Sequence, residues 1–107
     1  MRISVIIITH NRPLEVKAAI KTVIEQSQKP HEIIVVDDAS KSDLKPDISD
    51  LINNSIPIRM ERFEKSQKPC KARNHGAKVA SGDILMFLDD DDTWESNKIE
   101  AIFFRFE

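Results

Sequence analysis

The sequence contains few of the features that mark several large classes of protein. Its only cysteine, Cys70, excludes a disulfide framework within the chain, and with two glycines it has no low-complexity tract or linker. No apolar run approaches the roughly 20 residues that a membrane-spanning helix needs. Lys and Arg number 16 against 18 Asp and Glu, so the basic character expected of a nucleic-acid-binding domain is missing. We therefore expect a cytoplasmic protein with no nucleic-acid partner.

Continuous apolar runs predict the strands of a buried sheet. Residues 3–8, 33–36 and 84–88 are apolar without the alternation of a half-exposed strand, which is typical of a parallel sheet covered on both faces. A weaker strand is expected at residues 56–62. Pro57 within it favours an edge position, because proline cannot donate a hydrogen bond to a neighbouring strand.

Apolar residues at helical spacing lie between and after these runs, and they predict helices over residues 16–24, 44–52, 72–80 and 99–106. Asn11 is the expected N-cap of the first helix. The second should end at Asn53 and Asn54. Gly82 should terminate the third in the left-handed conformation. The small residues of that third stripe would allow a close approach to the sheet.

Alternation of strands and helices through the whole chain predicts an α/β fold. We expect an open, mainly parallel sheet with helices on both faces and the strand order 3-2-1-4, formed by a single domain over residues 1–107. In such sheets ligands bind outside the carboxyl ends of the strands, where the strand order reverses. That point lies here between the first and last strands.

Polar clusters follow three of the predicted strands, at residues 9–12 (THNR), 37–40 (DDAS) and 89–92 (DDDD). All three should meet at one edge of the sheet. Four adjacent carboxylates repel one another unless a cation offsets their charge. Mg²⁺ and Mn²⁺ prefer carboxylate oxygens and leave positions for substrate phosphates. Arg12, Lys71 and Arg73 are available for those phosphates, and no set of Cys and His suits zinc.

Each cluster also has a structural interpretation. Asp37 and Asp38 could cap the second helix or solvate a turn, and four aspartates after a strand could form a solvated turn. The sequence leaves His10 open between a structural and a functional role. Trp94 is expected to be a packing anchor rather than a stacking platform for a ligand.

Four segments of the sequence resemble the family 2 glycosyltransferases of the GT-A fold. They are SVIIITHNRP (4–13), EIIVVDDAS (32–40), KARNHGAKVASGDILMFLDDDD (71–92) and TWESNKIE (93–100), and together they cover nearly the whole chain. The resemblance implies a metal-dependent, inverting transferase that moves a sugar from a nucleotide-sugar donor, expected to be a UDP-sugar. The acceptor would be a sugar, a lipid-linked sugar or a polysaccharide, as in polysaccharide biosynthesis.

Two parts of the family's donor site map onto the first two polar clusters. Thr9 and Asn11 match residues that line the pocket for the nucleotide base. Asp38, with Asp37 beside it, matches the carboxylate that binds uracil. A glycine that the family often has ahead of its third helix is absent from residues 64–71, which is also the most loop-like stretch of the sequence.

The remaining family residues map onto the third helix and the acidic run. Arg73 and Asn74 match an Arg-Asn pair near the sugar diphosphate. The Asp-x-Asp (DxD) motif matches residues 89–91, with Asp91 as the main ligand of Mn²⁺ or Mg²⁺ and Asp89 as a second ligand. Asp89 or Asp90 would also lie near the ribose.

The resemblance also implies parts that these residues do not supply. Inversion needs a general base on the acceptor hydroxyl, and we expect that base beyond Glu107. We therefore expect a donor-binding half, truncated from a longer protein that is peripheral to the membrane. Such a half should expose an apolar face and self-associate through it.

Two alternatives of a different kind stay open. An apolar strand followed by Asp89, Asp91 and Thr93 also resembles haloacid-dehalogenase-like phosphatases, with Asp89 as the nucleophile and Asp91 as the acid/base. The chain could instead be a non-catalytic nucleotide-binding module. A preference for uridine diphosphate (UDP) would argue against the phosphatase, and sugar transfer or donor hydrolysis would argue against the module.

Overall fold

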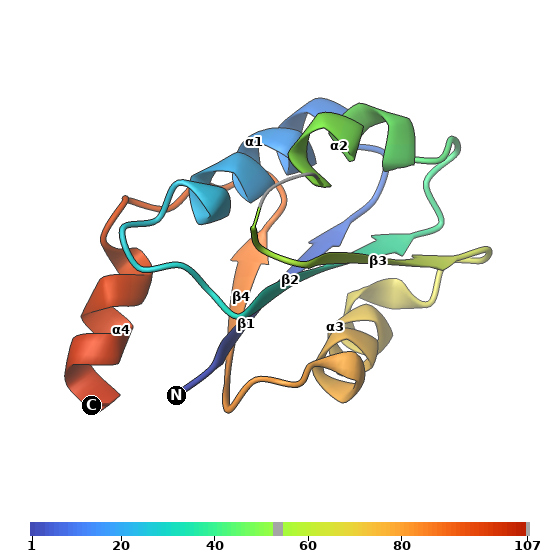
Figure 1. The fold of residues 1–107 in the computed structure, drawn as a ribbon. Coiled ribbons are helices and arrows are strands. Elements are labelled where there is room, and N and C mark those ends of the chain that lie inside the picture. The colour runs from blue at the N-terminus through green and yellow to red at the C-terminus, as the bar shows by residue number, and fades with distance from the viewer. Residues whose placement is uncertain (53–54, 107) are drawn as a thin grey trace.

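The computed structural model describes residues 1–52 and 55–106, and it shows a four-stranded sheet with helices on both faces (Figure 1). The elements are β1 (Ile3–Thr9), α1 (Pro13–Ile24), β2 (Glu32–Asp38), α2 (Lys45–Ile52), β3 (Ile58–Phe63), α3 (Lys68–Val79), β4 (Ile84–Asp89) and α4 (Lys98–Phe106). All strand pairs are parallel and the order is β3-β2-β1-β4, which confirms the predicted fold class and strand order. The predicted end of the second helix at Asn53 and Asn54 lies outside the described residues, as does Glu107.

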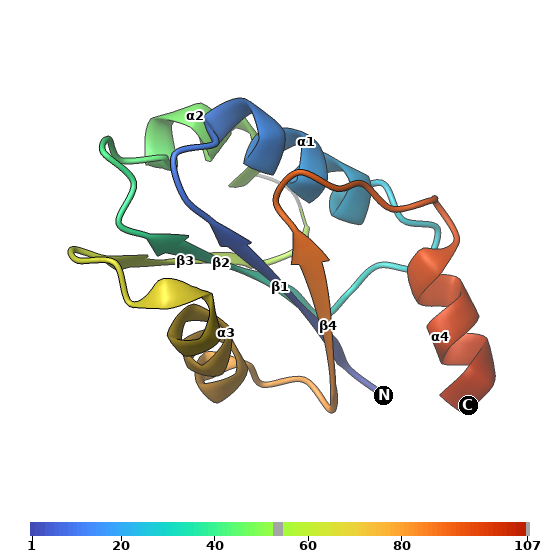
Figure 2. The same cartoon turned by 180° about the vertical axis from the view of Figure 1, so that it is seen from behind.

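Alternate side chains of the central strand β1 enter two separate cores. Val5 and Ile7 pack in the core beneath α1, α2 and α4, whereas Ile6 packs beneath α3 on the opposite face. Figure 2 shows α3 below the sheet and α1 and α2 above it. Burial on both faces explains why β1 and β2 are apolar without alternation. Trp94 packs against the larger core, so its prediction as a packing anchor is confirmed.

Two details predicted for the helix ends are wrong. Asn11 does not cap α1: the N-cap position is Arg12, and no side chain caps this end. Asn11 instead adopts the left-handed backbone conformation, with φ of 54°. Helix α3 ends at Val79, and neither glycine has a positive φ, so Gly82 is not a left-handed terminator. It lies against the start of β1, where space rather than backbone freedom requires a glycine.

The edge strand β4 exposes apolar side chains on the face that carries α3. Leu85 is 36% exposed and Phe87 is 46% exposed, because α3 packs over β1 and β2 and leaves β4 uncovered. Self-association through this face stays a prediction. In the described parts of the chain, no helix has both the length and the apolar character to cross a membrane.

Glu32 joins the bottom of β2 to β1 and to the turn before β4. Its Oε2 accepts hydrogen bonds from Ser4 Oγ at 2.6 Å, from Ser81 N at 2.7 Å and from Ser81 Oγ at 2.9 Å. Desolvation by burial opposes ionisation, but the hydrogen bonds from Ser4 and Ser81 together outweigh it and lower the pKa of Glu32.

We expect Glu32→Gln to lower the free energy of unfolding at neutral pH by roughly 1 kcal/mol, the scale of one hydrogen bond. A carboxyl with a lowered folded-state pKa stabilises the protein above its unfolded-state value, here 4.5, and this contribution disappears as the pH falls through the folded-state pKa. Denaturant unfolding should therefore show the variant and the wild type converging below about pH 4. Glu64→Gln, at an exposed position, is the control; a constant gap between Glu32→Gln and the wild type at every pH would contradict the assignment.

Candidate functional site

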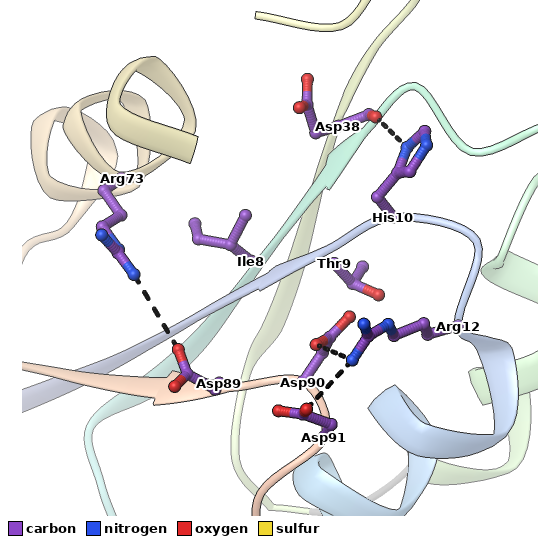
Figure 3. Close-up of a pocket in the computed structure, with 9 residues that line it drawn as sticks. All are labelled: Ile8, Thr9, His10, Arg12, Asp38, Arg73, Asp89, Asp90 and Asp91. Atoms are coloured by element: carbon purple, nitrogen blue, oxygen red, sulfur yellow. Dashed lines mark hydrogen bonds and ion pairs between the residues drawn. The ribbon is translucent and has the colours of Figure 1, made fainter. Parts of the chain in front are cut away.

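A cavity of about 300 Å³ opens at the carboxyl ends of β1, β2 and β4 (Figure 3). Its lining residues are Ile8, Thr9, His10, Arg12, Asp38, Arg73, Asp89, Asp90 and Asp91. The cavity lies where the strand order reverses, the position at which open α/β sheets bind ligands. All three predicted polar clusters therefore contribute, but the second does so only through Asp38.

The acidic run forms a tight turn at the end of β4. The strand ends at Asp89, and Asp92 N donates a hydrogen bond to Asp89 O at 3.0 Å. The side chains of Asp89 and Asp91 are 72% and 60% exposed, whereas that of Asp90 is only 14% exposed. The turn thus presents two solvent-accessible carboxylates at the mouth of the cavity and keeps a third inside it.

Two arginines approach these carboxylates from opposite sides (Figure 3). Arg12 Nη1 lies 3.1 Å from Asp91 Oδ2 and 3.5 Å from Asp90 Oδ1, and Arg73 Nη2 lies 3.9 Å from Asp89 Oδ1. The hydrogen bond to Asp91, with the charge of Asp90, raises the pKa of Arg12. Four aspartates and two arginines line the cavity, which leaves a formal charge of −2 that a divalent cation would neutralise.

The described residues fit a metal site whose ligands come partly from the protein and partly from a bound substrate. Among residues 1–52 and 55–106, no three His, Cys, Asp or Glu side chains converge in a way that could hold a metal ion. Asp89 and Asp91 are accessible, and Mg²⁺-type ions are commonly held by one or two carboxylates together with substrate phosphates. A metal at Asp91 would take the place of the ion pair that Arg12 makes there.

Asp38 is fixed in the cavity wall by the segment before α3. Its Oδ1 accepts a hydrogen bond from Gln67 N at 2.7 Å and its Oδ2 accepts one from Ser66 Oγ at 3.0 Å. The residue is only 6% exposed. Since an ionised carboxylate can accept about four hydrogen bonds, Asp38 retains acceptor capacity for a ligand.

Asp37 does not line the cavity, and its side chain faces the opposite side of β2 from that of Asp38. Its carboxylate is fully buried, and Oδ1 accepts hydrogen bonds from Ser40 N and Ser40 Oγ. Arg62 Nε lies 3.6 Å from Oδ2. Ser40 Oγ in turn accepts a hydrogen bond from Asn11 N at 2.8 Å, and Asn11 Oδ1 accepts one from Lys41 N at 2.7 Å.

Of the predicted site residues, Asn11, Asp37 and Asn74 therefore do not line the cavity. The first two join the loop after β1 to the loop after β2 and so support the cavity wall. Asn74 is exposed on α3, one residue after Arg73, which does line the cavity. Their predicted contacts with a donor stay predictions.

His10 and Ile8 also line the cavity; the sequence left the role of His10 open and gave none to Ile8. His10 Nδ1 donates to the carbonyl oxygen of Asp38, so its Nε2 is the acceptor for Asn11 Nδ2 at 3.0 Å. The signal that could have found His10 is its position directly after β1. Beside it, Thr9 Oγ1 is buried and has no hydrogen-bond partner in the described part of the chain, which suits it to a polar ligand atom.

Comparisons with known proteins identify the family of the chain. The family model described as Glycosyl transferase family 2 matches residues 4–107. A Haemophilus influenzae protein named as an uncharacterized glycosyltransferase is 36% identical over 100 residues, which are 94% of this chain and 33% of that protein. The Escherichia coli UDP-Glc:alpha-D-GlcNAc-diphosphoundecaprenol beta-1,3-glucosyltransferase WfgD is 31% identical over 98 residues, 92% of this chain and 38% of that enzyme. The chain thus spans about a third of the length of these curated relatives.

Solved structures give the same fold. S. aureus TarS in complex with UDP has a TM-score of 0.83 and 27% identity, over 96% of this chain and 31% of that chain. TarS in complex with UDP-GlcNAc has a TM-score of 0.81 and 27% identity, over 96% and 30%. The Pyrobaculum calidifontis mannosyltransferase PcManGT, in complex with GDP-Man and Mn²⁺, has a TM-score of 0.79 over 92% and 30%; at 23% identity it supports the fold alone.

Proposed function

The chain belongs to glycosyl transferase family 2, and on this premise we propose that it forms the donor-binding portion of a metal-dependent, inverting glycosyltransferase. A UDP-sugar is the proposed donor, because TarS, at 27% identity, is crystallised with UDP and with UDP-GlcNAc. A lipid-linked sugar or a growing polysaccharide is the proposed acceptor, since the E. coli relative is named for a diphosphoundecaprenol-linked sugar. The observation that carries the proposal is the cavity in which Asp38, Arg73 and the acidic turn meet.

Family membership excludes the phosphatase alternative. The haloacid-dehalogenase-like interpretation of Asp89 and Asp91 needs their motif near the start of the core domain, on its first strand. Here the motif ends β4, the last strand of a sheet whose whole length matches the glycosyltransferase family model.

Different residues of the cavity would bind different parts of the donor. Asp38, held by the segment before α3, would accept a hydrogen bond from the uracil ring. The unpartnered hydroxyl of Thr9, which also lines the cavity, would bind another polar atom of the donor. Arg73 and Arg12 already face carboxylates from two sides. We propose that, when the donor binds, both guanidinium groups exchange their aspartate partners for oxygens of the diphosphate. Arginine suits this role because its planar guanidinium can donate two parallel hydrogen bonds to a phosphate.

Asp91, with Asp89 as a second ligand, would hold Mn²⁺ or Mg²⁺ together with the diphosphate. When bound, the ion would act as a Lewis acid that offsets negative charge on the departing nucleoside diphosphate. To share the ion with the diphosphate, the carboxylates of Asp89 and Asp91 have to face the place where the diphosphate binds. Both side chains are exposed and can turn in that direction.

Direct displacement with inversion also requires a general base on the acceptor hydroxyl. We propose that the base follows Glu107 in a longer protein, together with the residues that select the acceptor. A cytoplasmic location, peripheral to the membrane, is part of the same proposal.

Calorimetric titration of the chain with UDP tests the proposal, first with Mn²⁺ and then with EDTA. We expect binding that requires the metal, because the cavity carries excess negative charge that would repel a diphosphate. Absence of binding by a chain that circular dichroism shows to be folded would contradict a self-sufficient donor site. Binding without sugar transfer or donor hydrolysis would support the non-catalytic module for the isolated chain.

Asp38→Ala should weaken binding of UDP by roughly ten- to a hundredfold and leave binding of pyrophosphate unchanged, since a hydrogen bond to a charged group contributes roughly 1.5–3 kcal/mol. The comparison of the two ligands corrects for any general effect on the fold, because both occupy the diphosphate position. Competition titrations in Mn²⁺ give both affinities. Equal weakening of UDP and pyrophosphate would mean that Asp38 supports the loop but does not contact the base.

A further inference from the structure

Gln26 is a fully buried polar side chain just after α1, outside the cavity. Its Nε2 donates hydrogen bonds to Glu95 O at 2.6 Å and to Thr22 O at 3.2 Å, and its Oε1 accepts one from Ile99 N at 2.9 Å. A buried carboxamide that uses both donor hydrogens and its acceptor is fully satisfied, and its removal would leave backbone groups of other segments unpaired.

The partners of Gln26 lie in the segment that directly follows the acidic turn. Glu95 comes four positions after Asp91, and Ile99 is in the first turn of α4. Two further hydrogen bonds join the same elements: Ser27 N donates to Ser96 O at 2.8 Å, and Trp94 N donates to Thr22 Oγ1 at 3.3 Å. The end of α1 therefore holds residues 94–99 at several points, and Gln26 is the buried centre of this attachment.

The acidic turn consequently has two anchors. On its N-terminal side β4 pairs with β1, where Ile8 is opposite Asp89. On its C-terminal side the anchor is the attachment to α1, because Asp91 and Asp92 themselves lie in a largely exposed turn. Without the second anchor the backbone at Asp91 would be held from the β4 side only, and the ion pair with Arg12 at the surface would be the other restraint on its carboxylate.

We propose that Gln26 is a positioning residue that fixes the carboxylate of Asp91 for binding of the metal and the donor. It acts through the backbone of Glu95 and Ile99 and touches neither ligand. The part of this inference that concerns the metal and the donor rests on the proposed function. The part that says Gln26 holds the acidic turn does not depend on that function. The requirement is for a carboxamide, since no other neutral side chain of this length offers a donor to Glu95 O and an acceptor to Ile99 N.

The test compares Gln26→Met, which keeps the length and volume but makes no hydrogen bonds, with Gln28→Met at an exposed position nearby. Amide hydrogen exchange by NMR reports on the turn through Asp92 N, which bonds to Asp89 O. Manganese EPR in the presence of UDP reports on the metal.

We expect Gln26→Met to accelerate exchange at Asp92 beyond any change in β1 and β2. We expect its Mn²⁺ affinity to fall about tenfold or more, as when a group that orients a metal ligand is lost. Gln28→Met should match the wild type in both.

A merely structural role would give a different result. Lower stability with uniform acceleration of all amides and an unchanged Mn²⁺ affinity of the folded protein would overturn the proposal. If the wild type binds no Mn²⁺ with UDP, the proposed function fails, and exchange at Asp92 alone then decides whether Gln26 holds the turn. Should Gln26→Met not fold, Thr22→Val removes the acceptor for Trp94 N together with the hydrogen bond that Thr22 Oγ1 donates to Ala19 O within α1. Exchange at Asp92 should then rise to a smaller extent, and no rise would overturn the proposal.

Discussion

Asp91→Asn should remove the metal-dependent part of UDP binding while the chain stays folded. The substitution keeps the size of the side chain and deletes the charge that an Mn²⁺ ion would neutralise. The side chain is 60% exposed and its ion pair with Arg12 is at the surface, so little stability should be lost. In Mn²⁺ we expect the affinity to fall by more than the roughly 10–100-fold that loss of an outer-shell partner of a metal costs. In EDTA the variant should bind UDP no more weakly than the wild type, because it has lost a charge that repels the diphosphate.

The adjacent Asp92→Asn is the matched control. Asp92 carries the same charge, but its Oδ1 accepts a hydrogen bond from Thr93 N and its side chain does not line the cavity. Calorimetry of both variants with UDP, each in Mn²⁺ and in EDTA, separates a specific ligand from the general charge of the turn. Equal losses in the two variants, or an unchanged affinity in Asp91→Asn, would contradict the role of Asp91 as a metal ligand.

Gly82→Ala should cost roughly 3 kcal/mol of unfolding free energy, the upper part of the range for overpacking a tight site. A Cβ at this position would lie 2.5 Å from Ser4 Oγ, 2.7 Å from Ser4 N and 3.0 Å from Arg2 O. Two of these obstacles are backbone atoms of β1 and of the residue before it, which the sheet holds in place. Gly82 N also donates a hydrogen bond to Ser4 Oγ at 2.9 Å, and the displaced loop would lose it.

Gly76→Ala provides the comparison within the same protein. Its Cβ would lie 2.6 Å from Ile6 Cγ2, which is a side-chain atom, and alanine in a helix recovers up to about 1 kcal/mol over glycine. We therefore expect a smaller loss at Gly76 than at Gly82. Denaturant unfolding of both variants measures the difference. An equal or smaller cost at Gly82 would show that the loop before β4 relaxes away from β1.

The acidic pair at the end of β2 shows how much of the site sequence reasoning can predict. The position of Asp37 and Asp38 at the end of an apolar run was enough to place both at the ligand-binding edge. Alternation along a strand requires that only one of them faces any given side. Which one faces the cavity depends on how the helices pack on the two faces of the sheet. Here it is Asp38, whereas Asp37 accepts a hydrogen bond from Ser40 Oγ.

Gln26 illustrates the opposite limit. In the sequence it is a polar residue at the end of an amphipathic stripe, where an exposed position is the ordinary expectation. Its burial follows from hydrogen bonds to Glu95 and Ile99, which lie far along the chain. No local sequence pattern predicts these contacts. The same holds for His10, whose orientation is set by the carbonyl group of Asp38.

The sequence by itself determined the alternation of strands and helices, the parallel sheet and the edge at which the polar clusters gather. These features follow from apolar periodicity and from the residues at strand ends, both of which are local along the chain. Only the tertiary structure decided that Arg12 faces Asp91, that Gly82 must make room for β1, and that Gln26 anchors the acidic turn. Each of these depends on distances between segments that are remote in sequence, and such distances are fixed only when the helices pack on the sheet.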